Sequence, residues 1–218
     1  MKKALFILTV LFSFSVSAQV FEFESEQQDQ HYQHRILMDD DYIIETIYQT
    51  NPPKFILTRG GFYDRKDDQL VAVLEFNSHF EKDSLREYRW DDQNWNKRSK
   101  KSQVLDGKWL MAGRVTPDGE QRRNISRPRK TQKLLVDGFF QWTAFNTETM
   151  QFYGSGGGAY RAQDGTYTEN IDYFSRDNSR VGMALSFLFN RQGKDWYHQG
   201  KSSKGKPMHE IWTERPEQ

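Results

Sequence analysis

The sequence contains no cysteine. A disulfide framework, a cysteine nucleophile and a lipid anchor attached to cysteine are therefore excluded, and the folded chain depends on its packed core for stability. The chain also lacks the G-x-S-x-G, H-E-x-x-H and P-loop motifs of common hydrolases and nucleotide-binding enzymes. These absences favour a protein that is not an enzyme, and we predict no catalytic residue, no cofactor and no metal.

Long hydrophobic runs are also lacking. The longest, residues 4–14, is well short of the ~20 apolar residues that a membrane-spanning helix needs. It follows two lysines and ends in the small-residue triplet Val16-Ser17-Ala18, which is the layout of a cleavable secretory signal. We predict that residues 1–18 are a signal peptide and that the protein is exported, to the periplasm or out of the cell, and does not span the membrane.

An excess of charge of one sign is missing as well. The 31 Lys and Arg residues balance 30 Asp and Glu residues, so the whole chain has no strong attraction for nucleic acid or for an anionic membrane. Two local basic stretches, residues 97–101 and 122–133, lack interleaved aromatic residues and are interpreted as solvated loops. The alternative for these stretches is contact with an anionic glycan or lipid headgroup. We predict no nucleic-acid partner.

Large rings are plentiful in a chain that is otherwise polar. Only 36% of residues are hydrophobic, yet 15% are aromatic, which is typical of half-buried strands with one wet face. Alternation of apolar and polar residues recurs between turns rich in Gly, Pro and Asp, and many short strands at this spacing indicate a sandwich or a barrel. The predicted strands cover residues 42–49, 54–63, 69–77, 85–90, 108–115, 139–146, 151–160, 166–174, 183–190, 195–200 and 209–215.

The chain carries an internal repeat. Residues 42–67 align without a gap on residues 139–164 at an offset of 97, and residues 36–39 match residues 134–137 at an offset of 98. We interpret this as a duplicated β-meander module with one residue of slippage upstream. The identical pairs are Thr46 and Thr143, Thr50 and Thr147, Phe55 and Phe152, Gly60 and Gly157, Gly61 and Gly158, Tyr63 and Tyr160, and Asp67 and Asp164.

Two short motifs frame the second half of the chain. Gly107-Lys108-Trp109 opens a predicted strand, and Trp212-Thr213-Glu214-Arg215 ends the last one. This pattern resembles that of the lipocalin-like (calycin) proteins, and the resemblance implies that the tryptophan closes one end of a barrel and that Arg215 lies over its indole. Further motifs, Phe139-Phe140-Gln141-Trp142, Gly157-Gly158-Ala159-Tyr160 and Gly165-Thr166-Tyr167-Thr168-Glu169-Asn170-Ile171, are similar to the secreted lipocalin-like domains of unknown function, of the DUF4488 type, found in Bacteroidetes.

The resemblance covers about residues 105–216 and implies a fold rather than an activity. We therefore predict an all-β protein, an antiparallel up-and-down lipocalin-like barrel with an internally duplicated meander module. The expected divisions are a signal peptide (1–18), an N-terminal extension (19–34), a first β-meander module (35–104) and a lipocalin-like barrel module (105–218). The sequence leaves open whether the two modules share one barrel or form two packed units.

One predicted strand mixes a carboxylate with rings. The period of two places Tyr167, Glu169, Ile171 and Tyr173 on one face of residues 166–174. If this face points inward, Glu169 is a buried acid that needs hydrogen-bond donors from Tyr160, Tyr167 or an arginine. A polar cluster among aromatic walls is the usual composition of a small-ligand site; the alternative is a network that only stabilises the barrel. The predicted ligand-binding residues are Trp142, Tyr160, Tyr167, Glu169, Trp212 and Arg215.

Three functions remain open from the sequence. The first is binding of a small apolar or amphipathic molecule in a barrel cavity. The second is a non-enzymatic envelope or surface protein with a solid barrel that binds a protein partner. The third is an enzyme that acts on a glycan or lipid through Glu169. The glycine-rich residues 154–159 precede another strand rather than a helix, so they are interpreted as a bulge or a tight bend and not as a phosphate-binding loop.

Overall fold

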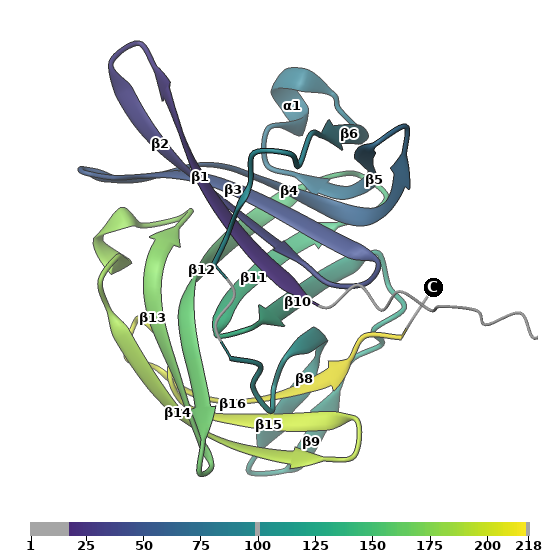
Figure 1. Ribbon diagram of the computed structural model, residues 1–218. Helices are drawn as coiled ribbons and strands as arrows, with labels where there is room; N and C mark the ends of the chain where they lie inside the picture. Colours follow the sequence, from purple (N-terminus) through teal and green to yellow (C-terminus); the bar gives the residue numbers. More distant parts are fainter. Residues whose placement is uncertain (1–17, 99–100, 217–218) are drawn as a thin grey trace, which may run out of the picture.

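The computed structural model describes residues 18–98 and 101–216. The predicted signal peptide lies outside these residues, apart from Ala18. In the described part of the chain, no helix has the length and hydrophobicity required to cross a membrane. The residues form two antiparallel β-sheets with two short helical turns (Figure 1).

The first sheet is open and has seven strands in the order β6-β5-β4-β3-β2-β1-β7. Consecutive strands pair as a meander, and the short strand β7 returns to pair with β1. The one-turn helix α1 (Phe80–Asp83) follows β5 and lies on the side of the sheet away from the barrel (Figure 1). The strands are β1 (Gln19–Gln27), β2 (Gln30–Met38), β3 (Tyr42–Thr50), β4 (Pro53–Lys66), β5 (Gln69–Asn77), β6 (Glu87–Trp90) and β7 (Asn96–Lys97).

The second sheet closes into a barrel. Strands β10 to β16 follow one another as an up-and-down meander, and β8 closes the ring by pairing with both β16 and β10. The predicted all-β fold with an antiparallel barrel is thus confirmed. The strands are β8 (Gly107–Thr116), β9 (Gly119–Arg122), β10 (Arg129–Val136), β11 (Phe139–Asn146), β12 (Phe152–Gln163), β13 (Thr166–Phe174), β14 (Ala184–Gln192), β15 (Asp195–Lys201) and β16 (Pro207–Glu214), with the turn η1 (Asn178–Arg180) after β13.

Some of the expected boundaries are wrong. Residues 19–34 are not a separate extension, because they form β1 and the first half of β2 within the first sheet. Residues 122–133 are not simply a solvated loop, because β10 begins at Arg129 and directs alternate residues into the barrel. The charged residues of β10 hid its alternation: Leu134 and Val136 face the first sheet, whereas Lys133 and Leu135 face the barrel interior.

The first sheet packs on the outside of the barrel, across β10 and β11 (Figure 1). The interface is an apolar layer of fully buried side chains with a hydrogen-bonded cluster inside it. The two modules therefore form one barrel and one covering sheet. The apolar layer consists of Val20, Leu37, Tyr42, Ile44 and Phe76 from the sheet and Leu134, Val136, Phe139 and Phe145 from the barrel.

Gln141 of β11 joins the two units. Its side-chain oxygen accepts hydrogen bonds from Thr46 Oγ1 at 2.7 Å and from Tyr173 OH at 2.7 Å. Its amide nitrogen donates to Thr58 Oγ1 at 2.9 Å and to Ser155 Oγ at 3.0 Å. Because all these groups are buried away from water, the side chain satisfies polar atoms from both units at once.

The pairing registers of the two units repeat at an offset of 97. The β3–β4 ladder is irregular at Ile47/Tyr48 and the β11–β12 ladder at Ala144/Phe145. A second pair of irregularities falls at Gly60/Gly61 and at Gly157/Gly158.

The same offset holds upstream, which corrects the expected slip of one residue. Strand β2 pairs Leu37 with Ile44, and β10 pairs Leu134 with Gln141. Both members of the first pair thus lie 97 residues before their counterparts. The offset of 98 matched similar residues but placed them on opposite faces of the strand.

Replacement of Gln141 by leucine is expected to lower the free energy of unfolding by about 2–4 kcal/mol, because it leaves the buried Tyr173 hydroxyl without a partner and removes one hydrogen bond from each of the other buried hydroxyl groups that contact Gln141. Denaturant unfolding of the full chain measures this loss. Gln199→Leu is the matched control, since Gln199 is an exposed strand residue, and its cost should stay below about 0.5 kcal/mol. Equal costs for the two variants would contradict the role given to Gln141.

Candidate ligand cavity in the barrel

One end of the barrel is solid. Trp109, Trp196 and Trp212 pack there with Tyr160 and Tyr167 in one cluster of buried side chains. The indole of Trp109 donates a 2.8 Å hydrogen bond to the carbonyl of Leu105, so the segment before β8 covers this end. The tryptophan thus closes the barrel, as the resemblance implied.

The arginine over the indole of Trp109 is not the expected one. The guanidinium carbon of Arg191, on β14, lies 5.3 Å from the centre of the indole. Arg215 points away from the barrel interior and forms an ion pair with Glu75 of the first sheet at 2.6 Å. The reason is that Arg215 follows the end of β16, where its guanidinium lies over Tyr42 and Phe62 in the interface.

The other end of the barrel is hollow. A cavity of about 610 Å³ extends from the buried residues of the barrel centre to the loops at the open end. Its volume lies within the range of small-molecule sites, roughly 300–1,000 Å³. The apolar wall consists of Met111, Phe140, Trp142, Ala144, Ile171, Phe174, Leu185, Phe187, Met208 and Trp212.

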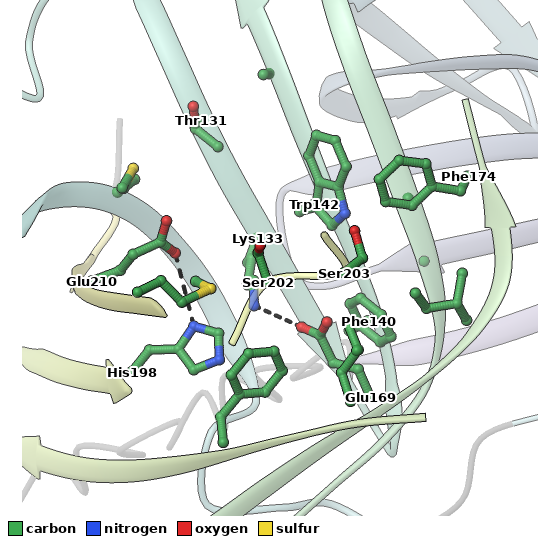
Figure 2. A pocket seen from close by; sticks show the side chains of 18 of the residues that line it. Thr131, Lys133, Phe140, Trp142, Glu169, Phe174, His198, Ser202, Ser203 and Glu210 are labelled. Carbon is green, nitrogen blue, oxygen red and sulfur yellow. Dashed lines mark hydrogen bonds and ion pairs between the residues drawn. The ribbon is translucent and has the colours of Figure 1, made fainter. Parts of the chain in front are cut away.

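A buried ion pair lies in the floor of this cavity. Lys133 Nζ of β10 is 2.7 Å from Glu169 Oε1 of β13, and each side chain is less than a tenth exposed (Figure 2). The hydroxyl of Tyr167 donates to the same carboxylate oxygen at 2.8 Å. Burial and the neighbouring Glu169 raise the pKa of Tyr167 well above its usual value, so the phenol remains a donor.

Aromatic rings surround the ammonium group of Lys133. Its Nζ lies 4.9 Å from the ring centre of Tyr167, 5.1 Å from that of Trp212 and 5.4 Å from that of Trp196. Ring faces attract a cation, and this attraction grows when water is excluded. The carboxylate and the rings together offset the cost of burying the charge.

A buried histidine borders the same floor. His198 of β15 stacks on Trp196, with 5.0 Å between ring centres, and packs against Phe187. Its Nδ1 lies 3.8 Å from Glu210 Oε2, a long ion-pair contact that is drawn as a dashed line in Figure 2. Among the described residues, neither ring nitrogen has a partner within hydrogen-bond distance. Burial and the charge of Lys133 lower the pKa of His198, so the ring is neutral at neutral pH.

A bulge determines which residues of β13 reach the cavity. Tyr167, Glu169 and Ile171 face the interior, which is the orientation that the proposed ligand site requires. Tyr173 does not, because Gly157 pairs with Tyr173 while Gly158 already pairs with Ile171, and this register shift reverses the alternation. Tyr173 therefore bonds Gln141 in the interface, and Phe174 lines the cavity in its place.

The bulge depends on glycine, as the glycine-rich sequence of residues 154–159 indicates. A Cβ atom on Gly158 would lie 1.8 Å from the carbonyl oxygen of Asn170, which no side chain can tolerate. A Cβ atom on Gly156 would meet the rings of Trp142 and Phe174 at 2.8 Å. The close approach of backbone and rings thus explains the glycine-rich sequence of β12.

The structure separates the six predicted ligand-binding residues into three places. Trp142, Glu169 and Trp212 line the cavity. Tyr167 lies beneath Glu169, and Tyr160 lies deeper still, where its hydroxyl donates to Asp106. Arg215 is outside the barrel and borders a second, polar hollow of about 450 Å³ at the closed end. Of the donors considered for Glu169, Tyr167 donates to the carboxylate, whereas Tyr160 does not. The cation that contacts it is a lysine, Lys133, and not an arginine.

Sequence reasoning missed several residues of the site, namely Lys133, His198, Glu210 and the arginines of the open end. The signal for Lys133 was the alternation of its strand. Leu134 and Val136 share one face, so Lys133 and Leu135 share the other. For His198, the signal was its spacing of two from Trp196 on one strand face.

No three His, Cys, Asp or Glu side chains of residues 18–98 and 101–216 are arranged to hold a metal ion. A scan against models of protein families and a search of curated proteins each found no match to this chain.

Lys133→Met is expected to lower the free energy of unfolding by about 3–5 kcal/mol, because it leaves the buried Glu169 carboxylate without its cation. The double variant Lys133→Met with Glu169→Gln should recover at least half of that loss, since it removes the unpaired charge. Lys130→Met is the control, because Lys130 lies on the outer face of the same strand. A double variant that is no more stable than the single one would contradict a direct interaction of the two charges.

His198 is expected to make stability fall in acid. Its folded-state pKa lies below the ordinary value of 6.5, so below about pH 6.5 the unfolded chain binds a proton that the folded chain does not. Stability should therefore fall progressively as the pH is lowered from about 7 to about 5.5. Thermal unfolding at both pH values should show a smaller loss for His198→Phe than for the parent, whereas the exposed control His31→Phe should match the parent.

Proposed function

We propose that this protein binds a small, partly apolar molecule inside the open half of its barrel. The observation that carries the proposal is the cavity of about 610 Å³, which joins an aromatic and aliphatic wall to a fixed polar group, the Lys133–Glu169 pair. Such a mixture of apolar wall and few oriented polar groups is the usual composition of a ligand site.

The polar floor is oriented before any ligand arrives. Lys133 and Tyr167 both bond Oε1 of Glu169, which fixes the carboxylate and leaves its Oε2 as an acceptor for a ligand. Packing around Lys133 by rings holds the ammonium in place as well. A preformed site loses little conformational entropy on binding, which favours affinity.

The proposal places the protein among exported lipocalin-like barrels of the DUF4488 type. The residues that support this are the tryptophan at the closed end, Trp109, and the up-and-down order of the strands. Export rests on the signal-like residues 1–18 alone.

The proposal includes a duplicated origin for the two sheets. The shared offset of 97 in register and bulges supports it. Contacts across the interface support it too, because Phe76 meets Phe145 and Tyr48 meets Tyr173, each at 4.9 Å between ring centres. At the offset of 97, Phe76 corresponds to Tyr173 and Tyr48 to Phe145, so each contact is the counterpart of the other. Contacts across the two-fold axis of a dimer have the same reciprocity.

A neutral dye provides the test of the binding proposal. N-phenyl-1-naphthylamine, which fluoresces in apolar surroundings, should bind the purified protein at one saturable site. Ala144→Phe, which adds a ring inside the cavity, should weaken binding about tenfold or more, because it fills the volume that the dye occupies.

The matched control for this test is Ala184→Phe, on an exposed position of β14 outside the cavity. It should leave dye affinity unchanged. Thermal unfolding of both variants checks that they are folded. Saturable dye binding of equal affinity for the two folded variants would refute a ligand site in the barrel.

A further inference from the structure

We infer that the ligand is an amphipathic anion whose apolar part enters the barrel while its anionic group stays among the arginines of the open end. This inference rests on the proposed function, since it assigns a chemical class to the occupant of the same cavity. It is carried by a second and separate observation, the distribution of charge along the barrel.

The open end of the cavity is strongly cationic. Seven cationic side chains line the cavity and only three carboxylates do, those of Glu169, Asp177 and Glu210. Apart from Lys133 in the floor, the cations come from six different segments around the mouth: Arg114 of β8, Arg123 after β9, Arg129 of β10, Arg176 after β13, Arg180 of η1 and Lys204 between β15 and β16.

Most of these cations have no acidic partner. Only Lys133 and Arg180 form an ion pair with a described residue, Lys133 with Glu169 and Arg180 with Asp177. Arg114 lies opposite Glu210 in the β8–β16 ladder, and the two do not form an ion pair. The remaining positive charges repel one another across the opening, and a bound anion relieves that repulsion.

The deep end of the cavity does not offer a free cation. The ammonium of Lys133 is occupied by the carboxylate of Glu169 and enclosed by rings, and His198 is neutral. An anionic group placed there would meet a second carboxylate in a buried site, which is unfavourable. The anion therefore belongs at the mouth, and the apolar wall below it takes the rest of the ligand.

The closed end of the barrel has the opposite charge. The polar hollow there is lined by the carboxylates of Asp39, Asp40, Asp41, Asp106 and Glu214, with only Lys108 and Arg215 as cations. An amphipathic anion is therefore attracted to one end of the barrel and repelled from the other. This distribution of charge matches a ligand whose apolar part enters the barrel first and whose anionic group remains at the mouth.

Two dyes with one skeleton provide the test. 8-Anilinonaphthalene-1-sulfonate carries the same rings as N-phenyl-1-naphthylamine with one added sulfonate. We expect the sulfonate to bind at least about tenfold more tightly than the neutral dye at low ionic strength, because charge-assisted hydrogen bonds to arginine are strong. Added salt should reduce this preference.

The double variant Arg114→Gln with Arg123→Gln removes two positive charges of the mouth and keeps polar side chains there, so it separates the effect of charge on binding from the effect of cavity shape. It should weaken binding of the sulfonate about tenfold more than it weakens binding of the neutral dye. Arg161→Gln is the matched control, because Arg161 is an exposed arginine of β12 at the other end of the barrel, outside the cavity lining. It should leave both affinities unchanged.

The outcomes distinguish this inference from the proposed function. Equal binding of the two dyes at the cavity would overturn the anionic class and leave the binding function standing, whereas no cavity binding of either dye would overturn both. Monomeric dodecanoate and phosphatidylglycerol vesicles, offered as competitors, identify the source of the anion. Displacement of the bound sulfonate dye by dodecanoate but not by the vesicles supports a free amphiphile. Displacement by the vesicles alone, together with co-sedimentation of the protein with them, supports a lipid headgroup.

Discussion

The ion pair between Lys133 and Glu169 lies where the solid half of the barrel meets the hollow half, and both halves depend on it. Below it, Tyr167 and the tryptophans form a cluster of buried side chains that contacts the two charged groups. Above it, a fully packed apolar core would have to cover a carboxylate oxygen that has no further donor, which is costly. The barrel therefore stays open on the side where a ligand, or water, can complete the polar contacts.

The first sheet has the same pairing registers but no ion pair at the corresponding positions. At the offset of 97 that relates the registers, the positions of Lys133 and Glu169 correspond to Ile36 and Ala72. Both are fully buried in an apolar cluster that includes Trp90, and no charge at these positions requires an open space. The sheet also ends at β6 and does not continue into a closing set of strands, so it covers the barrel and does not enclose an interior of its own.

The strand-rich fold could be predicted because the alternation of apolar and polar residues is a local pattern, and the closing tryptophan was implied by the resemblance. Register-dependent features were less accessible. The face of Tyr173 changed because a bulge at Gly157/Gly158 reversed the alternation, and a period of two cannot anticipate where an extra residue enters a ladder. Lys133 was hidden in a stretch of basic residues, since a buried lysine is recognised only once its partner 36 residues away is known. Arg215 was assigned to the barrel from the resemblance, but its position just after β16 turns it toward Glu75, and only the packed first sheet reveals that contact.

The choice of cations gives the two parts of the cavity different responses to pH. Arginine keeps its charge throughout the physiological range, so the mouth stays cationic whenever the protein is folded. In the floor, the ammonium of Lys133 disfavours a second positive charge on His198, and burial acts in the same direction. Protonation of His198 would place two cations beside one another in a region of low dielectric, with Glu169 and Glu210 as the nearby carboxylates. Mild acid thus acts on His198 in the packed floor, whereas the arginines of the mouth keep their charge.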